Sequence, residues 1–386
     1  MKTLKKIIRV IGLCIIIIGL VHSTPSIVSA AAEKAQSFKT PVIQIYLNNT
    51  PLISSSGVPT LLNGTIMIPL GGLYISGATV NYDESMKMIS IANMFTKGSM
   101  KVGNQKAIVN GKAVVYSEGP RQINKQLYLP LRFVNDAIGG SLNWNAKSRK
   151  VVISYPEFVG DGKISNDAYF LNGVSGALYK RDTVGVVRSL GVSTAKLEPG
   201  YIGNTQVSFV NIAEDTDLVT IRNSSGEPSI NLTVINLFVK NGAILRQSTG
   251  HYWQFSPEDL KIYNGYAVMN DGHVIRLIAP DASVKESWNL SKLAGEPDVS
   301  YAIEAIGENY LIARSSQEGL LTLIDMEAKQ AVLLYKEFGI NPSDMPGFKY
   351  DGITFTGNGK NKSELQFEFT DTKKIKTAFT YQLGAQ

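Results

Sequence analysis

Short apolar runs separated by turn residues dominate the sequence from residue 41 onwards. In 42–47, apolar and polar residues roughly alternate, and the turn signal Asn48-Asn49 follows. A period of two is typical of a half-buried β-strand, and adjacent asparagines are typical of turns. The pattern therefore predicts that strands begin near residue 42 and continue through most of the chain.

One pattern of strand, proline, short helix, glycine and hairpin occurs twice in residues 42–156. The corresponding segments are 63–70 and 124–131, then 78–83 and 140–145, and finally 88–91 and 151–153. Proline can begin a helix because its missing N–H would have no partner in the first turn anyway. The repeat predicts a small α+β domain built from two related units.

The two copies differ in their predicted helices. In the second copy, Leu131, Val134 and Ile138 fall on one helical face, and Gly139-Gly140 can end the helix. The first copy carries Gly71-Gly72 inside the corresponding segment. Glycine costs about 1 kcal/mol relative to alanine in a helix, so we expect a weaker helix in the first copy.

The repeat resembles the small α+β module known as the copper amine oxidase N-terminal, or stalk-like, domain of exported proteins from Bacillus-like bacteria. The residues that carry the resemblance are Leu129–Phe133, Gly139-Gly140, Asn143–Asn145 and Val151–Ile153. The resemblance implies a spacer or surface-binding unit and says little about activity. The first copy departs from the pattern at Gly71-Gly72 and at Tyr82, where tryptophan is usual.

Residues 166–386 contain strands and turns without a long helical period. Two similar units begin at Tyr266 and Tyr310, and a repeat of about 40–45 residues with three or four short strands is typical of a propeller blade. We therefore predict an all-β domain, a β-propeller of about five blades, with an irregular β-sandwich or barrel as the alternative. The preceding residues, 157–165, are predicted to be a linker.

The first thirty residues have the pattern of a secretory signal peptide. Basic residues between Lys2 and Arg9 precede the apolar run 10–21, and small residues end the segment at Ala30. A retained membrane anchor is the alternative, but the apolar run is shorter than the roughly 20 residues that span a bilayer. We expect a secreted, extracellular protein with a mobile leader in 31–41 and no transmembrane segment after cleavage.

The net charge and the cysteine content of the chain limit the classes of partner and the cell compartment that we expect. Removing residues 1–30 takes away four basic side chains, so the formal net charge falls from +6 to +2. A nucleic-acid partner is therefore not expected, and the basic cluster 373–376 is interpreted as a solvated strand end or turn. The single cysteine, Cys14, lies inside the signal peptide, so no disulfide is expected. This pattern fits a protein associated with the cell wall of a Gram-positive bacterium.

The sequence argues against a copper enzyme. Asn81-Tyr82-Asp83 is similar to the setting of the tyrosine that copper amine oxidases convert to their quinone cofactor, but Ala78 replaces its threonine. The second copy has Trp144 at the same place, so the match belongs to the repeat. Only His251 and His273 lie outside the signal peptide, too few for a three-imidazole site. We expect no amine oxidase activity, no metal and no cofactor.

Other candidate residues have a structural interpretation beside a functional one. Tyr82 and Trp144 are interpreted as core residues beside the hairpins, with sugar stacking as the alternative. The cluster His251-Tyr252-Trp253 is interpreted as packing at a blade edge, with a ligand site as the alternative, and His273 as a solvated turn residue. Segment 214–217 lacks the glycine and terminal glutamate of a Ca²⁺ loop and is interpreted as a solvated turn.

These patterns favour a non-enzymatic exported protein. The N-terminal repeat would be a spacer or envelope-docking unit, and the β-rich region would bind a wall polymer, a carbohydrate or another envelope protein. The alternative is an extracellular carbohydrate-active enzyme with an acidic pair in the β-rich region. Carboxylates that such a pair could use include Glu304, Asp325, Glu337 and Asp344. The sequence assigns no catalytic, metal, cofactor or binding residue.

Overall fold

The computed structural model describes residues 42–386, except 53–55, 161–167, 185, 199, 229, 348–349 and 385–386. The predicted signal peptide 1–30 and the predicted leader 31–41 lie outside the described residues. Within the described part of the chain, no helix is long and apolar enough to cross a membrane.

Two four-stranded sheets of the N-terminal domain, residues 42–156, join its two repeats. The strands of the first lie in the order β12 (Ser141–Asn145), β13 (Lys150–Ser154), β1 (Gln44–Leu47) and β2 (Thr50–Pro51). Those of the second lie in the order β10 (Arg121–Ile123), β11 (Gln126–Pro130), β4 (Thr65–Pro69) and β3 (Thr60–Leu62). β1 pairs in parallel with β13, and β11 pairs with β4. Each sheet therefore combines strands of both copies.

The single helix described in this domain packs on its third sheet. That sheet is antiparallel, with β5 (Thr79–Asp83), β6 (Met88–Ala92), β7 (Lys97–Lys101), β8 (Lys106–Val109) and β9 (Lys112–Val115). Helix α1 (Leu131–Ala137) buries Leu131, Phe133 and Val134 in the domain core. Gly98 permits the close approach, since a Cβ there would lie 2.6 Å from the Cβ of Ala137. The helix predicted for the second copy is confirmed.

The corresponding segment of the first copy, residues 70–78, is a loop. Gly72 and Gly77 have φ angles of +73° and +71°, in the left-handed region that glycine enters without steric cost. The N–H of Leu73 donates to the carbonyl of Leu70 over 3.0 Å, which closes a turn. The first copy therefore lacks its helix altogether, a larger effect of Gly71-Gly72 than the weakening we predicted.

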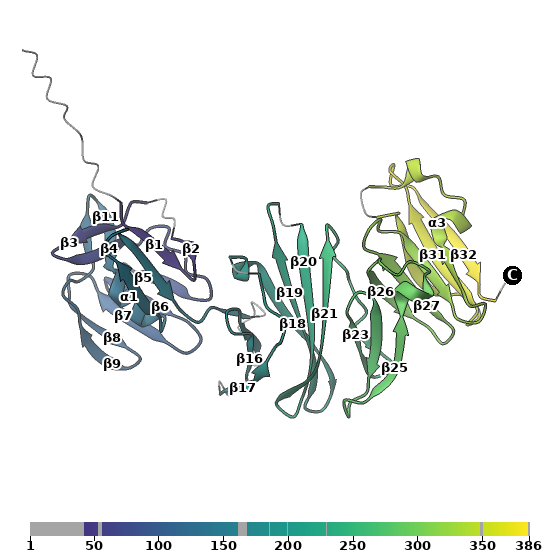
Figure 1. Ribbon diagram of the computed structural model, residues 1–386, viewed down its shortest axis with the longest axis horizontal. Coiled ribbons are helices and arrows are strands. Elements are labelled where there is room, and N and C mark those ends of the chain that lie inside the picture. The colour runs from purple at the N-terminus through teal and green to yellow at the C-terminus, as the bar shows by residue number, and fades with distance from the viewer. Residues whose placement is uncertain are drawn as a thin grey trace, which may run out of the picture. The chain divides into compact units, whose positions relative to one another are not determined.

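Five consecutive antiparallel sheets follow in the described residues, each with its strands in chain order (Figure 1). The first two sheets contain β14 (Phe158–Gly160), β15 (Ala168–Asn172), β16 (Ala177–Arg181) and β17 (Val187–Val192), then β18 (Thr205–Ala213), β19 (Thr216–Ser225), β20 (Asn231–Lys240) and β21 (Ala243–Trp253). The next two contain β22 (Ile262–Tyr263), β23 (Tyr266–Asn270), β24 (Val274–Ile278) and β25 (Val284–Asn289), then β26 (Tyr301–Ile306), β27 (Tyr310–Ser315), β28 (Leu321–Asp325) and β29 (Gln330–Leu333). The fifth contains β30 (Ile353–Asn358), β31 (Glu364–Thr370) and β32 (Lys376–Gln382).

Short helical segments, η1 (Ile202–Asn204), α2 (Leu290–Leu293), α3 (Leu334–Glu337) and η2 (Pro342–Asp344), lie between these strands. The region is therefore mostly β and consists of four four-stranded antiparallel sheets and one three-stranded sheet in the described residues, as predicted for units of three or four strands. The strand pairing does not by itself identify a propeller.

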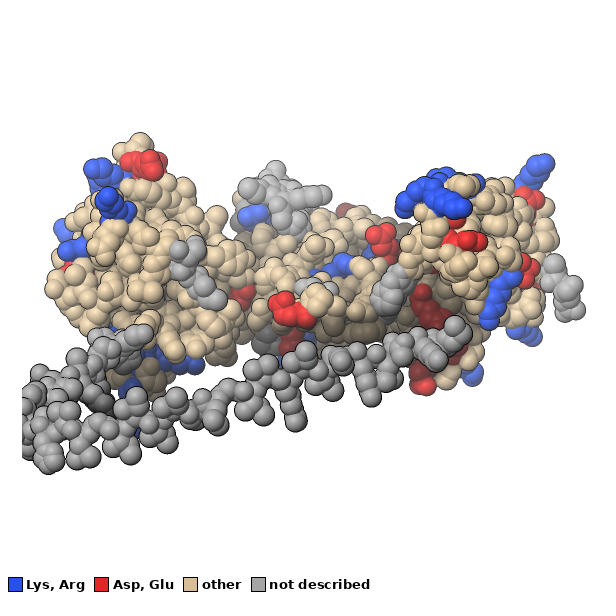
Figure 2. Space-filling model, turned by 90° about the horizontal axis from the view of Figure 1, so that it is seen from above, with Lys and Arg blue, Asp and Glu red and all other residues tan. Residues whose placement is uncertain are grey.

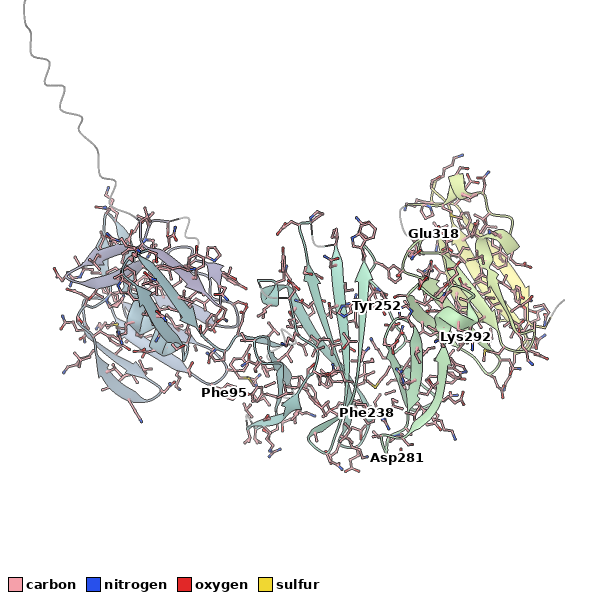
Figure 3. The ribbon with its side chains drawn as sticks, in the orientation of Figure 1. Phe95, Phe238, Tyr252, Asp281, Lys292 and Glu318 are labelled. Atoms are coloured by element: carbon pink, nitrogen blue, oxygen red, sulfur yellow. The ribbon has the colours of Figure 1, made fainter. Side chains whose placement is uncertain are left out.

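The first strand of the β-rich region begins inside the segment predicted to be a linker. β14 occupies 158–160, and Val159 is buried in the core shared by the first two sheets. Phe95 of the N-terminal domain, labelled in Figure 3, packs edge-on against Phe158 at 5.0 Å and Tyr179 at 5.1 Å. The apolar side chains of this short segment thus pack on both sides, which a free linker would not allow. Residues 161–165 of the predicted linker lie outside the described residues.

A buried polar network links the second, third and fourth sheets. Asn270 donates to Asp259 Oδ1 and to the carbonyl of Tyr301, each over 2.8 Å. Asp259 Oδ1 also accepts the N–H of Ile303 at 2.9 Å, and the Ser248 hydroxyl donates to the carbonyl of Asn270 at 3.0 Å. A buried polar group without a partner costs about 1–3 kcal/mol, so these bonds favour one arrangement of the three sheets.

Candidate functional site

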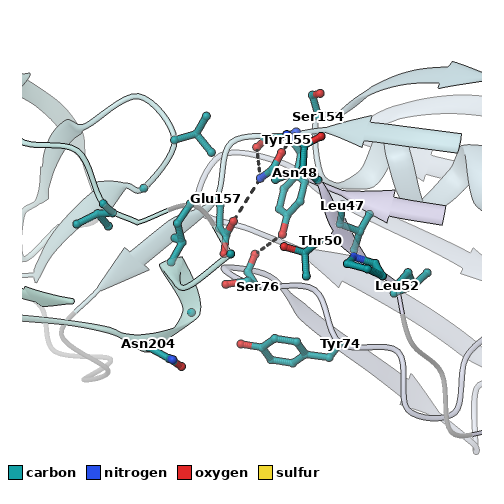
Figure 4. A pocket seen from close by; sticks show the side chains of 18 of the residues that line it. Leu47, Asn48, Thr50, Leu52, Tyr74, Ser76, Ser154, Tyr155, Glu157 and Asn204 are labelled. Atoms are coloured by element: carbon teal, nitrogen blue, oxygen red, sulfur yellow. Dashed lines mark hydrogen bonds between the residues drawn. The ribbon is translucent and has the colours of Figure 1, made fainter. Parts of the chain in front are cut away.

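The loop that replaces the first-copy helix forms one wall of a hollow (Figure 4). Tyr74 lies in this loop with 71% of its surface exposed. If these residues formed a helix, their backbone N–H and C=O groups would pair with one another inside it. The glycines that prevent the helix therefore also produce the loop that presents an aromatic ring.

Buried hydrogen bonds fix the floor of this hollow. The Tyr155 hydroxyl donates to the carbonyl of Ser76 over 3.0 Å. Asn48 Nδ2 donates to the carbonyl of Tyr155 over 3.0 Å and to Glu157 Oε2 over 3.3 Å, and Asn48 Oδ1 accepts the N–H of Tyr155 at 2.9 Å. Burial raises the pKa of Tyr155, and the charge of Glu157 raises it further. Tyr155 is therefore a neutral hydrogen-bond donor at ordinary pH, held in one orientation.

The opposite wall is the connection between the first and second sheets, which contains η1. Gly173 allows this connection to pack closely, because a Cβ there would lie 2.3 Å from Ile202 Cγ2. A Cβ on Gly203 would lie 3.6 Å from the Tyr74 hydroxyl, which shows that the two walls face each other. Lys196 and Asn204 add polar groups to this wall.

We refer to this space, of about 640 Å³, as the tyrosine hollow. The polar groups and the ring that line it include Asn48, Thr50, Tyr74, Glu157, Lys196 and Asn204. Its size falls in the range of ligand pockets, about 300–1,000 Å³. Amides, a carboxylate, an ammonium group and a hydroxyl beside an exposed ring can donate and accept hydrogen bonds and cover an apolar ligand face.

Three further hollows lie beside it, each named here after one lining residue. The tryptophan hollow, of 570 Å³, is lined by Lys196, Glu198, Tyr201, Asn231, His251 and Trp253, among others. The arginine hollow, of 410 Å³, is lined by Asn204, Gln206, Arg222, Asn231, Gln254 and Ser256, among others. The glutamate hollow, of 320 Å³, includes Gln254, Glu258, Glu304, Arg314 and Tyr350.

Shared wall residues connect the four hollows. Asn204 borders the tyrosine and arginine hollows, Lys196 the tyrosine and tryptophan hollows, and Asn231 the tryptophan and arginine hollows. Gln254 borders the arginine and glutamate hollows. The four hollows therefore adjoin one another, and we refer to the group as the row of hollows. The charged residues that line the hollows are of both signs: Glu157, Glu198, Glu258 and Glu304, with Lys196, Arg222 and Arg314. The lining is therefore not a strongly basic track of the nucleic-acid-binding kind. The face shown in Figure 2 likewise carries scattered acidic and basic side chains.

The aromatic cluster at the end of β21 takes part in this row. His251 and Trp253 are exposed, with Trp253 at 55%, whereas Tyr252 is buried at 3% and packs against Phe255. Strand alternation explains the difference, because successive side chains point to opposite faces. The predicted packing role therefore applies to Tyr252, and the alternative, a ligand site, remains open for the other two.

Three sequence interpretations change in the structure. Trp144 is 41% exposed at the edge strand β12, so it is not a core residue, whereas Tyr82 is half-buried against the core. His273 is half-buried rather than solvated, since its Nδ1 lies 2.7 Å from Ser291 Oγ. Asp217 is buried, not part of a solvated turn.

The burial of Asp217 is compensated by three bonds. Its Oδ2 accepts the Tyr169 hydroxyl at 2.5 Å and Lys180 Nζ at 2.9 Å, and its Oδ1 accepts Asn211 Nδ2 at 3.0 Å. Burial raises the pKa of Asp217, but these bonds outweigh it and the pKa is lowered. The carboxylate is thus a charged structural group between the first two sheets.

The four carboxylates considered for hydrolysis do not gather in one place. Glu304 borders the glutamate hollow and is paired with Arg314 through both of its oxygens. Asp325 is fully buried and accepts the N–H groups of Glu327, Ala328 and Gly384. None of the four hollows is lined by Glu337 or Asp344. Among the described residues, no group of three or more His, Cys, Asp or Glu side chains is arranged to hold a metal ion.

The sequence analysis missed most residues that line the hollows. Tyr74, Arg222 and Gln254 belong to no motif, and only their tertiary neighbours give them a role. One signal was present: the pair Gly71-Gly72 marks where the first copy departs from its repeat, and the exposed Tyr74 follows it.

Comparisons with known proteins bear out the resemblance of the N-terminal repeat. Residues 46–153 match the family described as "Copper amine oxidase N-terminal domain", as the repeat predicted, and cover under a third of the chain. No curated protein matches the sequence.

The solved structures to which the chain is similar include β-propeller proteins. With the BP39L lectin from Burkholderia pseudomallei it has a TM-score of 0.26 and 13% identity, over 81% of this chain and 82% of that chain. With virginiamycin B lyase from Staphylococcus aureus it has a TM-score of 0.21 and 8% identity, over 83% and 88%. With a puromycin-hydrolyzing peptidase of Mycobacterium tuberculosis it has a TM-score of 0.29 and 10% identity, over 80% of this chain and only 45% of that chain.

Proposed function

We propose that this protein is a non-enzymatic exported protein that binds an extended carbohydrate of the cell envelope along its row of hollows. The observation that carries the proposal is the sharing of wall residues among four neighbouring hollows. A small ligand needs one pocket, whereas a row of connected hollows suits a polymer that occupies several at once. In this proposal the consecutive sheets act as about five propeller blades that hold their connecting loops on one face.

The chemistry of the walls supports a carbohydrate rather than a protein partner. Tyr74 and Trp253 expose large rings, and Asn48, Asn204 and Asn231 add amides. A sugar has apolar ring faces and many hydroxyls, so it can stack on aromatic rings and exchange hydrogen bonds with amides. Protein interfaces of stable complexes are generally larger and have an apolar, fully buried centre.

Replacing Tyr74 tests this function. We expect Tyr74→Ala to weaken binding to insoluble cell-wall polysaccharide by roughly two- to twelvefold, because a stacked aromatic ring contributes about 0.5–1.5 kcal/mol. Tyr74→Phe keeps the ring and should retain most of the affinity. The measurement is co-sedimentation of the purified full chain with cell-wall material over a range of polymer concentrations.

The matched control is Trp144→Ala. Trp144 is an exposed aromatic residue of the same domain, 41% exposed, and lies outside the four hollows. Its removal should leave binding unchanged. Equal losses from both variants would mean non-specific adsorption, and a wild-type chain that stays in the supernatant would rule out envelope binding.

The alternative function, hydrolysis of a polysaccharide, rests on Glu258 and Glu304, which both line the glutamate hollow. A glycoside hydrolase needs two carboxyl groups about 5–9.5 Å apart across the scissile bond. Release of reducing ends from a wall polymer, lost in both Glu258→Gln and Glu304→Gln, would establish this alternative. Polymer bound without any new reducing ends would favour binding alone.

A further inference from the structure

Arg222 is the charged residue among those that line the arginine hollow. Its Nη1 donates to the carbonyl of Pro257 over 2.7 Å, and its Nη2 donates to Ser256 Oγ over 2.6 Å. Both acceptors are neutral, and Arg222 forms no ion pair with any described residue. A guanidinium has five N–H donors, so three remain for a ligand. Arginine is suited to binding the oxygens of a carboxylate or phosphate, and no carboxylate among the described residues pairs with Arg222.

The remaining walls of this hollow carry no negative charge. The polar side chains that line it are Asn204, Gln206, Ser224, Asn231, Gln254 and Ser256, and no aspartate or glutamate is among them. This composition differs from the tyrosine, tryptophan and glutamate hollows, each of which has at least one glutamate. The arginine hollow is therefore the part of the row with an uncompensated positive charge.

Gln254 is a second, independent feature of the same hollow. Its backbone has φ +49°, a left-handed conformation that costs a non-glycine residue about 1–2 kcal/mol. Its Oε1 is buried and accepts no hydrogen bond among the described residues. Local strain and unsatisfied polar atoms concentrate at functional sites. The Gln254 amide oxygen could therefore turn toward a ligand without losing a hydrogen bond to any described residue.

We propose that the arginine hollow binds the acid group of an acidic carbohydrate polymer, with the guanidinium of Arg222 on the anion and the Gln254 amide on a neighbouring hydroxyl. The planar fork of an arginine fits the two oxygens of a carboxylate or a phosphate. The amides and hydroxyls around it suit the polyol part of the same ligand. This inference rests on the proposed function and names the class of polymer that the row would select.

Retention on three soluble polymers tests the inference: polygalacturonate, which carries carboxylates; polyglycerol phosphate, which carries phosphodiesters; and dextran, which is neutral. We expect the purified full chain to bind one of the acidic polymers at least about tenfold more tightly than dextran, since a hydrogen bond to a charged group contributes about 1.5–3 kcal/mol. The preference should shrink at high salt, because screening weakens charge pairs. The acidic polymer that is preferred identifies carboxylate or phosphate as the group bound.

Two variants locate the effect. Arg222→Gln removes the charge, and Gln254→Glu keeps the shape of the side chain but adds a negative charge while Arg222 stays in place. Both should abolish the preference for acidic polymer over dextran. Arg222→Lys, which keeps the charge without the fork, should lose part of the preference. The control is Arg188→Gln, an equal charge change at a side chain that is 70% exposed and outside the hollows.

The outcomes separate this inference from the proposed function. Equal binding of acidic and neutral polymers, or a preference that survives in both Arg222→Gln and Gln254→Glu, would overturn the acid site alone. A preference lost equally in Arg188→Gln would show that net charge, not this hollow, is responsible, and would also overturn it. A full chain that binds none of the polymers and no cell-wall material would overturn the proposed function as well.

Discussion

Asp351→Asn should destabilise the β-rich region more than any other single change of an acidic residue considered in this chain. Asp351 is fully buried, and Arg314 is only 7% exposed. Asp351 Oδ1 accepts Arg314 Nη1 at 2.8 Å and the N–H of Ile353 at 3.1 Å, while Oδ2 accepts the N–H of Leu321 at 2.6 Å. Removing one partner of a buried ion pair costs about 3–5 kcal/mol. Glu304 still pairs with Arg314 in this variant, so we expect a loss at the lower end of that range.

The position of this pair makes its loss consequential. Arg314 belongs to β27 of the fourth sheet and also donates to the carbonyl of Ile353, in β30 of the fifth, over 2.8 Å. Burial alone would lower the pKa of Arg314, but Glu304 and Asp351 raise it above its usual value. The guanidinium therefore stays charged, and neither sheet can relax without exposing or neutralising it.

Urea denaturation of the full chain, followed by circular dichroism, measures the effect. We expect a lower midpoint for Asp351→Asn at an unchanged slope, which indicates a change in stability rather than in the surface exposed on unfolding. The control is Glu308→Gln, whose partner Lys362 is 83% exposed. Exposed pairs of this kind often contribute nothing measurable, so its midpoint should not move. Equal shifts in both variants would contradict a structural role for the buried pair.

Gly77→Ala should separate the N-terminal domain from the first sheet of the β-rich region. Gly77 has φ +71°, and a Cβ there would lie 2.5 Å from the carbonyl oxygen of Phe158. The left-handed conformation would cost alanine about 1–2 kcal/mol, and overpacking against rigid backbone typically costs a further 1–3 kcal/mol. The contacts of Phe95 with Phe158 and Tyr179 would be lost as the backbone shifts.

A second glycine distinguishes the two causes. Gly64 has φ +80°, but a Cβ there would meet no atom within 4 Å. Gly64→Ala should therefore show the conformational cost alone. We expect only Gly77→Ala to expose the connection near residue 158 to limited proteolysis and to weaken polymer binding, because the tyrosine hollow has walls from both sides of this contact. If both variants resist proteolysis like the wild type, the contact at Gly77 does not hold the two parts together.

Much of the fold could be predicted from the sequence because the determining signals are local. Proline, glycine and apolar periodicity placed the second-copy helix at α1, and the recurrence of the same motifs 61–63 residues later revealed the repeat. Alternating strands with turn residues between them indicated a β-rich second region. The glycine pair Gly71-Gly72 predicted a weak helix, but the structure has a loop there. The low helix propensity of glycine was therefore enough to remove the helix.

Long-range neighbours decided the rest. Trp144 and Tyr82 hold equivalent places in the two copies and both lie on edge strands, yet only Tyr82 packs against the domain core, whereas Trp144 is 41% exposed. Segment 214–217 has the composition of a solvated turn, but Asp217 is buried because Tyr169 and Lys180, from another sheet, provide its partners. No pattern within a few residues of Asp217 contains that information.

The sequence by itself determined which segments form strands, where the repeat lies and which residue types are too few for a copper enzyme, because these depend on composition and on neighbours along the chain. Only the tertiary structure decided that Tyr74, Arg222 and Gln254 line connected hollows. Their positions depend on how the ends of separate sheets come together, and side chains far apart in the sequence meet only when those sheets have packed.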